Sequence, residues 1–558
     1  MALNDFFRNL LIFGNAPCSV RYATFYVTVM SIQLKNISLG LDEKETLLKE
    51  KAAAALRIAP EDISELKIVR KSLDARKKKR IHFFYSLAVS LPPGLEKQVL
   101  SSALPEVSRL EESVPLPAIR IEKRPKERPV VVGTGPAGLF AALRLVESGA
   151  PPLIVERGRE IPERVKDVDR FWKEGDLDPG SNVQFGEGGA GTFSDGKLYT
   201  RLQEPQIVFL LKTFCRFGAP EEILYLQRPH LGTDRLRRII LALRKYLQEK
   251  GAEYRFQTQL TGLEIHQGAI QGAILNDQIR VSASVLLLAI GNGARDTFQM
   301  LSRSGVALEP KPFALGLRVE HPQKLIDRIQ YGPSAGHPRL PPADYHLTFR
   351  SSRDRGVYSF CMCPGGLVIG AGSESGQVVT NGMSLFRRNA PWANSALIVS
   401  VGPKDFTSQG PLAGIEFQRK WEEKAFLLGG GNFKAPAQNL LDFLNGRDPG
   451  PIRETSFQPG VSPARLQECL PSFVVEGLRE ALPVFNRKMP GFCSPEAVLI
   501  GVETRTSSPL RILREEDFQS RTVKGLYPCG EGSGYAGGIV SSALDGIKAA
   551  EAIMKTWA

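Results

Sequence analysis

Cysteine and histidine are scarce in this chain, with seven cysteines and six histidines among 558 residues. The cysteines are odd in number, are spread over the whole length and form no C-x-x-C pair. This pattern excludes a disulfide framework and argues against a zinc site. Nor does any apolar run reach the roughly 18 residues that a membrane helix needs. We therefore expect a protein of the reducing cytoplasm, with no bound metal and no membrane partner.

The first 29 residues lack the features of a signal peptide. Asp5 and Gly14 interrupt the apolar stretch, and no basic residues with a small-residue cleavage site frame it. We interpret residues 1–29 as an extension and Met30 as the start of the folded protein.

An acidic excess is also absent, since 72 Lys and Arg against 59 Asp and Glu give a net charge of +13. The positive charge is spread along the chain, which favours an anionic cofactor over a nucleic acid. One basic run, "RKSLDARKKKR" (residues 70–80), lies between two predicted strands. It is either a solvated hairpin loop or a contact for RNA or a partner protein.

The beginning of the folded chain predicts a small α+β domain over residues 30–115. "SIQLKNISL" alternates as a strand does, "EKETLLKEKAAAALRI" has helical spacing, and "IHFFYSLAVSL" is typical of a buried strand. The proline-rich segment that follows predicts a linker over residues 116–126.

The strongest motif is "RPVVVGTGPAGLFAALRLVESGAPPLIVERG", which contains a G-x-G-x-x-G between a strand and a helix. Gly133 permits the tight turn, Gly135 lets a pyrophosphate approach the backbone, and Gly138 lets the helix pack on the strand. Glu156, at the end of the second strand, is expected to accept both hydroxyls of an adenosine ribose. The segment predicts a dinucleotide site at a helix N-terminus.

The C-terminal stretch "GLYPCGEGSGYAGGIVSSALDGIKAAEAI" favours FAD over NAD as that dinucleotide. Glu531 follows a strand and is placed to bond a ribityl hydroxyl. A helix that begins near Gly538 can stabilise the negative charge that develops on flavin reduction. Gly291, after the apolar strand "SVLLLAI", is expected to pass beneath the cofactor.

"GTFSDGKL", residues 191–198, has the spacing of a phosphate-binding P-loop, but the position after Lys197 is a leucine that cannot hold Mg²⁺. The stretch before it is not a buried strand. We therefore expect this glycine-rich loop to line a flavin instead, with Lys197 beside the flavin or its phosphates.

The three glycine-rich segments resemble the glutathione-reductase-like FAD superfamily. "FGEGGAGTFSDGKL", "RGVYSFCMCPGG", "GVETRTSSPLRI", "GLYPCGEGSGYAGGIVSSALDGI" and "KSLDARKKKRI" more closely resemble the bacterial FAD-dependent dehydrogenases, or NAD(P)/FAD-dependent oxidoreductases. The resemblance implies an α/β fold with a discontinuous Rossmann-like FAD-binding domain (127–315 and 500–558). An inserted α+β substrate or cap domain (316–499) and the small N-terminal domain complete it.

The predicted site follows from these segments. The cofactor-binding residues are Gly133, Gly135, Pro136, Ala137, Gly138, Glu156, Arg157, Gly188, Gly189, Ala190, Gly191, Thr192, Ser194, Lys197, Leu198, Gly291, Gly530, Glu531, Gly537, Gly538 and Ile539. The catalytic candidates are Lys197, Cys363 and Glu503. Gly370-x-Gly372 lacks a following helix, so a nicotinamide donor, NAD(P)H, would only visit the flavin transiently.

Several candidates keep two interpretations. Cys361 and Cys363 stand too close in sequence for an unstrained disulfide. They mark either a plain strand end or a thiol at the pocket, with Cys363 favoured. Arg505 either binds a substrate carboxylate or pairs with Glu503 inside the fold. His321 is either an acid/base group or a hydrogen-bonded surface residue.

The function expected from these residues is that of an FAD-dependent oxidoreductase, which exchanges a hydride with a small-molecule substrate at flavin N5. Two alternatives stay open, namely an FAD-containing RNA-binding or RNA-modifying protein and a flavin-binding protein without turnover. The sequence leaves the substrate and the oligomeric state open.

Overall fold

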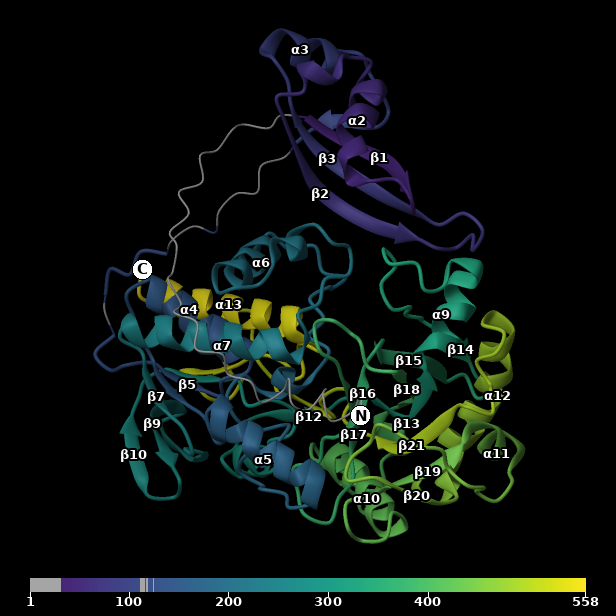
Figure 1. Cartoon of the computed structure of the whole chain (residues 1–558). Coiled ribbons are helices and arrows are strands. Elements are labelled where there is room, and N and C mark those ends of the chain that lie inside the picture. Colours follow the sequence, from purple (N-terminus) through teal and green to yellow (C-terminus); the bar gives the residue numbers. More distant parts are fainter. Residues whose placement is uncertain (1–31, 111–115, 117–118, 124) are drawn as a thin grey trace.

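The computed structural model describes residues 32–110, 116, 119–123 and 125–558. The hypothesis about residues 1–29 therefore lies outside the described part. The first unit is a four-stranded antiparallel sheet in the order β2-β3-β1-β4. Two helices cover one face of it (Figure 1). The elements are β1 (Ile32–Gly40), α2 (Leu48–Leu56), β2 (Glu65–Asp74), β3 (His82–Ser90), α3 (Pro93–Ser101) and β4 (Val107–Arg109).

The predicted strands and helix of this unit are confirmed, and α3 and β4 add to them. The basic run is only partly a loop, because β2 continues through Asp74 and pairs with β3 as far as His82. A bulge between Leu34 and Ile37 shifts the alternation along β1, so that Leu34 and Leu39 both join Leu87 in the core beneath α2.

The second unit is built around a five-stranded parallel sheet in the order β23-β11-β5-β6-β7. Its inner strands β11, β5 and β6 are apolar on both faces, as a parallel sheet with two covered faces requires, whereas the edge strand β7 is polar. Residues such as Val131 and Leu287 pack on one side, while Val130 and Leu286 pack on the other. The strands are β5 (Val130–Val132), β6 (Leu153–Val155), β7 (Glu253–Arg255), β11 (Leu286–Leu288) and β23 (Leu526–Pro528).

Helices α4, α7 and α13 lie side by side over one face of this sheet (Figure 1). A three-stranded antiparallel sheet and α8 share the core of the opposite face. The elements are α4 (Pro136–Glu147), α5 (Ile161–Glu174), α6 (Gln206–Arg216), α7 (Gly232–Glu249), β8 (Leu260–His266), β9 (Ala269–Leu275), β10 (Ile279–Ser282), α8 (Arg295–Arg303) and α13 (Ile539–Lys555). α7 is amphipathic and buries Leu236, Ile240 and Leu243 along one side.

A seven-stranded sheet in the order β14-β15-β18-β13-β21-β19-β20 carries the third core. Its strands are β13 (Phe313–Pro322), β14 (Thr348–Arg350), β15 (Gly356–Cys363), β18 (Trp392–Val401), β19 (Ala435–Asn439), β20 (Val461–Pro463) and β21 (Val498–Glu503). Its helices are α9 (Gln323–Tyr331), α10 (Ala413–Leu428), α11 (Leu440–Asn445) and α12 (Ser472–Lys488). Two short pairs complete the fold: β12 (Leu308–Pro310) with β22 (Leu510–Ile512), and β16 (Leu367–Gly370) with β17 (Thr380–Met383).

The fold is the expected mixed α/β architecture with a parallel, Rossmann-like sheet. β23, from the C-terminal segment, lies beside β11 and extends the parallel sheet. The predicted domain boundaries at 315/316 and 499/500 fall inside β13 and β21. The division into domains therefore stays a prediction. Among the described residues, no helix combines the length and the apolar character needed to cross a membrane.

Candidate active site

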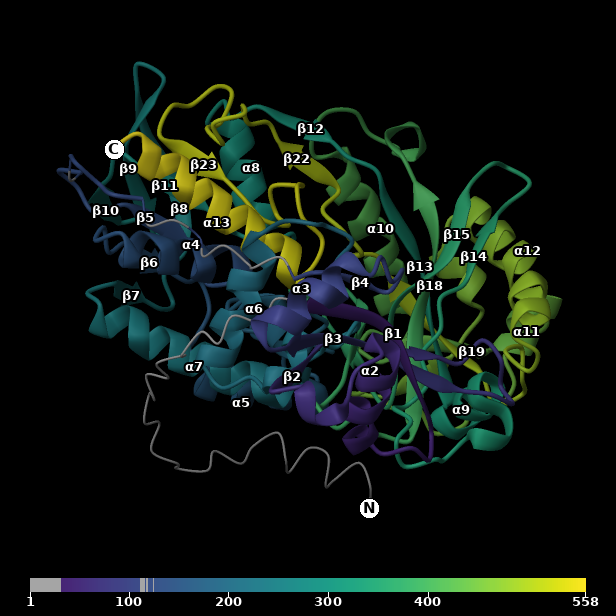
Figure 2. The ribbon, with the colours of Figure 1, turned by 90° about the horizontal axis from the view of Figure 1, so that it is seen from above.

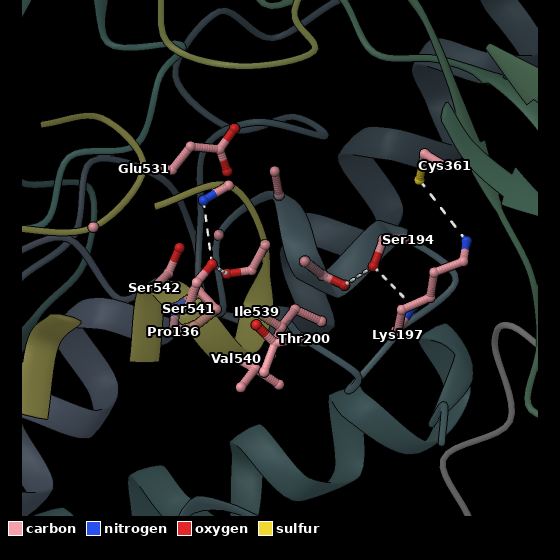
Figure 3. A pocket seen from close by; sticks show the side chains of 18 of the residues that line it. Pro136, Ser194, Lys197, Thr200, Cys361, Glu531, Ile539, Val540, Ser541 and Ser542 are labelled. Atoms are coloured by element: carbon pink, nitrogen blue, oxygen red, sulfur yellow. Dashed lines mark hydrogen bonds between the residues drawn. The ribbon is translucent and has the colours of Figure 1, made fainter. Parts of the chain in front are cut away.

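A cavity of about 1770 Å³ opens at the carboxyl ends of the parallel strands. Its lining includes Val132, Val155, Ala289 and Cys529, each at or directly after the end of one of these strands. Ligands of open parallel sheets bind at this edge, because helix N-termini and loops gather there. Figure 3 shows part of the lining, with residues of α13, the glycine-rich loop and β15 around one space.

Two glycines of the G-x-G-x-x-G segment allow the backbone to pack closely, and the remaining one leaves space for a ligand. A side chain on Gly138 would place its Cβ 1.9 Å from the Gly133 carbonyl oxygen, and one on Gly133 would meet the Ala289 oxygen at 2.4 Å. Gly135 differs, because the nearest atom that its Cβ would meet is the Gly189 Cα at 3.9 Å. Gly135 precedes α4 and leaves room for a ligand at the helix N-terminus.

A second helix begins at the same cavity. Gly537 and Gly538 precede α13, and a Cβ on either one would meet no protein atom within 4 Å. Further along α13, Gly546 packs against α4, where its Cβ would lie 2.1 Å from the Ala137 oxygen. The close crossing of the two helices holds both positive N-termini on one cavity.

The glycine-rich loop between α5 and α6 is held from inside by Arg164 of α5, a residue that the sequence analysis missed. Its fully buried guanidinium donates to four backbone carbonyls, at 2.9 Å to Asn182, 3.0 Å to Val183, 3.1 Å to Gly186 and 2.6 Å to Glu187. Burial lowers the pKa of Arg164 to about 10, so the group stays charged at neutral pH. Helical spacing from Ile161 places Arg164 on the apolar face of α5, which is the signal that could have revealed it.

Glu156 lines the cavity, but its carboxylate is occupied by protein donors. It accepts from the Thr134 amide at 2.9 Å, the Thr134 hydroxyl at 2.6 Å, the Gly158 amide at 3.0 Å and the Gly186 amide at 2.9 Å. A carboxylate has about four acceptor positions. Ribose hydroxyls would have to replace some of these donors, so in this structure Glu156 joins the glycine turn to the loop.

Glu531 lines the cavity with an oxygen 2.8 Å from the Asn292 side-chain nitrogen, which donates to it. Burial is the largest influence on this carboxyl and raises its pKa to about 7, while Lys311 and Asn292 oppose that shift. Near pH 7 the carboxyl is therefore protonated in part of the molecules, so it can donate a hydrogen bond to a ligand hydroxyl or accept one from it.

The raised pKa predicts how Glu531 affects stability. Between its ordinary value of 4.5 and about 7, the folded protein holds a proton that the unfolded chain releases. The free energy of unfolding must fall as pH rises through this window. Glu531→Gln should remove this fall in the free energy of unfolding with pH, measured by urea titration of flavin-free protein at several pH values. Glu249→Gln, exposed on α7, should show the same slope against pH as the parent protein. Identical slopes in all three proteins would contradict the assignment.

Lys197 lies at the end of the loop, with its ammonium 3.3 Å from an Asp195 oxygen. Asp195 is buried and also accepts from the Arg388 Nε at 3.0 Å and from the Ser384 hydroxyl. Burial opposes the charge of Asp195, but Lys197 and Arg388 outweigh it and lower its pKa. Burial likewise opposes the charge of Lys197, yet Asp195 and two thiols raise its pKa. The ammonium is therefore a fixed positive charge on the cavity wall.

Those thiols belong to Cys361 and Cys363, whose sulfurs lie 3.9 and 3.8 Å from the Lys197 Nζ. A bulge in β15, with Cys361 at φ +46°, turns both side chains toward the lysine. Cys361 lines the cavity, whereas Cys363 is fully buried outside the lining. The preference for Cys363 over Cys361 as the pocket thiol is therefore corrected, because regular strand geometry fails at the bulge.

The Cys363 thiol and the Lys197 ammonium lower the pKa of the Cys361 thiol. Iodoacetamide, which attacks thiolates, should therefore alkylate Cys361 faster at neutral pH than an ordinary thiol. Cys361→Ser should remove the fast phase of alkylation, followed by mass spectrometry, while Cys493→Ser should retain it. A fast phase that survives in Cys361→Ser would contradict this.

Glu503 lines the cavity but is locked in an ion pair. The guanidinium of the buried Arg318 donates to both of its oxygens, at 2.9 and 2.7 Å, and Thr380 adds a third bond at 3.1 Å. Burial raises the pKa of Glu503, and Arg318 opposes the shift. Of the two interpretations of Arg505, the pair with Glu503 is wrong, because Glu503 pairs with Arg318. β21 ends at Glu503, and Arg505 beyond it donates to Glu422 at 3.0 Å.

Glu422 is the centre of a buried cluster that also occupies Arg505. Its oxygens accept from Arg295 at 2.8 Å, from Arg505 and from the Thr504 hydroxyl at 2.7 Å. Arg505 lines the cavity, but this cluster leaves it less free to bind a substrate carboxylate.

His321 is a buried residue, neither an acid/base group of the cavity nor a surface histidine. Its Nε2 lies 2.8 Å from the Phe492 carbonyl oxygen, and burial lowers its pKa to about 4. The expectation for Gly370-x-Gly372 is confirmed, because an antiparallel strand, β17, follows and no helix lies between.

Most of the predicted cofactor-binding residues meet at the cavity. Those that line it are Gly133, Gly135, Pro136, Ala137, Glu156, Arg157, Gly189, Ala190, Gly191, Ser194, Lys197, Gly291, Gly530, Glu531, Gly537, Gly538 and Ile539. Gly138, Gly188, Thr192 and Leu198 lie behind the lining. Thr192 fills the space beside Gly188, and Leu198 is buried in the helical core.

Two family models match parts of the chain. Residues 312–506 match "FAD-dependent protein, C-terminal domain-like", and residues 31–90 match a domain of unknown function. A Clostridium beijerinckii protein, described as an uncharacterized protein, is 45% identical over 530 residues. The alignment covers 94% of this chain and 99% of that relative. The chain belongs to the same family as this relative, and its residues 312–506 match the FAD-dependent C-terminal-domain family. FAD is its cofactor.

The cavity fits this cofactor. Gly135, Gly537 and Gly538 leave open space where side chains would stand, and two helix N-termini face that space. Backbone amides at such positions bind a pyrophosphate. The chain would hold the dinucleotide through α4, α13 and the loop of residues 189–194.

Solved structures resemble the chain only distantly. CtdE in complex with FAD is 12% identical with a TM-score of 0.30, and covers 77% of this chain and 84% of its own. Glycine oxidase from Bacillus cereus is 12% identical with a TM-score of 0.32, and covers 77% and 95%. At such scores the likenesses carry no weight for the activity of this protein.

Proposed function

We propose that the protein is an FAD-dependent oxidoreductase that exchanges a hydride with a small-molecule substrate. The observation that carries this is the convergence of three glycine-rich segments, around residues 133, 189 and 537, on one cavity that also holds a lysine and a thiol. FAD, when bound, supplies hydride exchange at N5 of its isoalloxazine ring.

The residues of this chain bind and orient the reactants. The N-termini of α4 and α13 attract negative charge to the cavity. Glu531, held by Asn292, can donate to or accept from a ribityl hydroxyl because its pKa is about 7. The ammonium of Lys197 adds a fixed positive charge, which Asp195 holds in place.

Transfer of a hydride to or from the substrate is accompanied by transfer of a proton, which a side chain at the cavity surface must accept or donate. Glu503 is bound at both oxygens, and His321 lies outside the lining. Cys361 is the better candidate, because its sulfur faces the cavity beside Lys197 and its pKa is lowered. We assign this proton transfer to the Cys361 sulfur.

Lys197→Met should weaken FAD retention or lower the flavin midpoint potential, because a positive charge that favours the reduced, negative cofactor is lost. It should also slow the alkylation of Cys361. The flavin-to-protein ratio after gel filtration, a dye-coupled potential measurement and the alkylation rate test this. Lys245→Met, exposed on α7, is the control. Unchanged values of all three quantities would remove Lys197 from the site.

The proposal is tested by the absorbance of the purified protein and by anaerobic reduction. Flavin absorbance is expected in the untreated protein. NADH, NADPH or a member of a broad panel of organic substrates should then bleach it. If none of them does so, the protein is a flavin-binding protein without turnover. Because no second dinucleotide segment is evident, we expect a nicotinamide to reduce the flavin only through a transient complex.

A further inference from the structure

We infer that the N-terminal sheet is the roof of the substrate half of the cavity, and that the substrate is an organic anion with an apolar or aromatic body. This inference rests on the proposed function. Gln33 and Lys35 of β1, Arg70 of β2 and Ser86 of β3 line the same cavity as the glycine-rich segments. Viewed from above, β1 to β3 lie over the middle of the molecule, between the parallel and the seven-stranded sheets (Figure 2).

The roof is fixed in place by backbone bonds. The Lys71 amide donates to the Tyr225 oxygen at 2.8 Å, and the Gln227 amide donates to the Lys71 oxygen at 3.0 Å. These bonds add residues 225–227 to the edge of β2 as a short parallel pairing. At the other end of the unit, the Arg339 guanidinium donates to the Leu41 oxygen at 2.9 Å. Since α2 packs on the opposite face, the helix-free face is the one turned to the cavity.

The positively charged residues of the cavity wall fall into two groups, those with an anionic partner among the described residues and those without one. Arg228 is paired with Asp344, Arg157 with Asp296, and Lys197 with Asp195. By contrast, Lys35, Arg70 and Arg201 also line the cavity, and their side chains make no ion pair or hydrogen bond to any described residue. Unpaired cations that converge on a cavity favour an anionic ligand.

Apolar side chains are exposed in the same region. Tyr199, Leu224 and Phe360 are 42%, 41% and 36% exposed, and all three line the cavity. Scattered single apolar residues on a surface need no explanation, but three around one cavity favour a ligand with an apolar body. Tyr199 lies two residues from Arg201, so the apolar and cationic groups are neighbours in sequence.

The size of the cavity allows a substrate beside the cofactor. Its volume of about 1770 Å³ exceeds the roughly 300–1,000 Å³ of a site for one drug-sized ligand. The glycine-rich segments occupy one part of the lining, whereas the roof residues, Tyr199 and Phe360 form another. We therefore assign the second part to the substrate.

Binding of two probes to the FAD-loaded protein tests the inference by calorimetry. 2-Naphthoate carries an aromatic body and a carboxylate, and 2-naphthylmethanol has the same body without the charge. We expect naphthoate to bind at least about tenfold more tightly, with an affinity that falls as salt rises. Equal affinities for the two probes, or no binding of naphthoate, would overturn the inference without any variant.

Charge reversal locates the anion site. Arg70→Glu combined with Arg201→Glu should weaken naphthoate binding about tenfold, since each exposed charge contributes modestly. Neither side chain has an ion-pair or hydrogen-bond partner in the described part of the chain, and retained flavin absorbance verifies the fold. Lys77→Glu with Lys79→Glu, on the exposed hairpin outside the cavity lining, is the matched control and should bind naphthoate as the parent does.

An RNA partner would give another result. A single-stranded RNA oligonucleotide would then bind the parent protein, and the hairpin variant would lose that binding while naphthoate affinity stayed independent of Arg70 and Arg201. That outcome overturns the inference. Failure of the proposed function is separate, because naphthoate can bind as expected in a protein whose flavin no reductant bleaches.

Discussion

Gly138→Ala is expected to abolish FAD retention and to lower the free energy of unfolding by about 3 kcal/mol or more. The new Cβ would stand 1.9 Å from the Gly133 oxygen and 3.4 Å from the Ala289 side chain. The first of these is a backbone atom, so α4 itself has to move away from β5. Such a shift would displace the helix N-terminus that faces the cavity. The flavin-to-protein ratio and urea unfolding measure the two effects.

Gly94→Ala is the matched control for this change. Gly94 lies in α3 with no atom within 4 Å of the new Cβ, so the substitution should be neutral or stabilise the protein by up to about 1 kcal/mol. A Gly138→Ala protein that keeps its flavin and its stability would show that α4 does not form the predicted close contact.

Arg164→Met should also release FAD, and should cost about 3–5 kcal/mol of stability. The variant would take the guanidinium donors away from the carbonyls of residues 182, 183, 186 and 187. The Gly186 and Glu187 oxygens would each keep one other donor, the Gly189 amide and the Thr192 hydroxyl. Because these carbonyls shape the loop that leads to Gly189, the loop would lose its form even where the variant still folds. Urea unfolding and flavin content measure the outcome.

Two further variants separate the guanidinium from general effects of substitution on α5. Lys166→Met, exposed on the same helix, should change stability by less than about 0.5 kcal/mol. Arg164→Lys should restore the charge but not the binding of four carbonyls, because an ammonium lacks the planar fork of the guanidinium. Full rescue by lysine would contradict the loop-shaping role and leave only a role for the charge.

The FAD site could be predicted from the sequence wherever its chemistry is local. Gly133, Gly135 and Gly138 act within one turn, so their spacing alone implies the close contacts that the structure contains. The same holds for Gly537 and Gly538 before α13. Backbone conformation and helix termini are fixed by residues a few positions apart, so the spacing of these glycines predicts the turns and helix starts that the structure contains.

The partners of the charged side chains could not be predicted, since they come from distant parts of the chain. Glu503 pairs with Arg318 rather than Arg505, and Arg505 pairs with Glu422. The choice of Cys363 over Cys361 failed for a related reason. Packing buries Cys363 behind the lining and leaves Cys361 as the thiol at the cavity, which the sequence does not reveal.

The sequence by itself determined where glycine-rich turns precede helix N-termini, because those turns need residues without side chains at fixed spacing. Only the tertiary structure decided what surrounds the cavity. It brought the N-terminal sheet over the cavity through the pairing of Lys71 with residues 225–227, and left Lys35, Arg70 and Arg201 without ion-pair partners among the described residues. Long-range packing sets which charges are neutralised, and the spacing of residues along a chain carries no record of it.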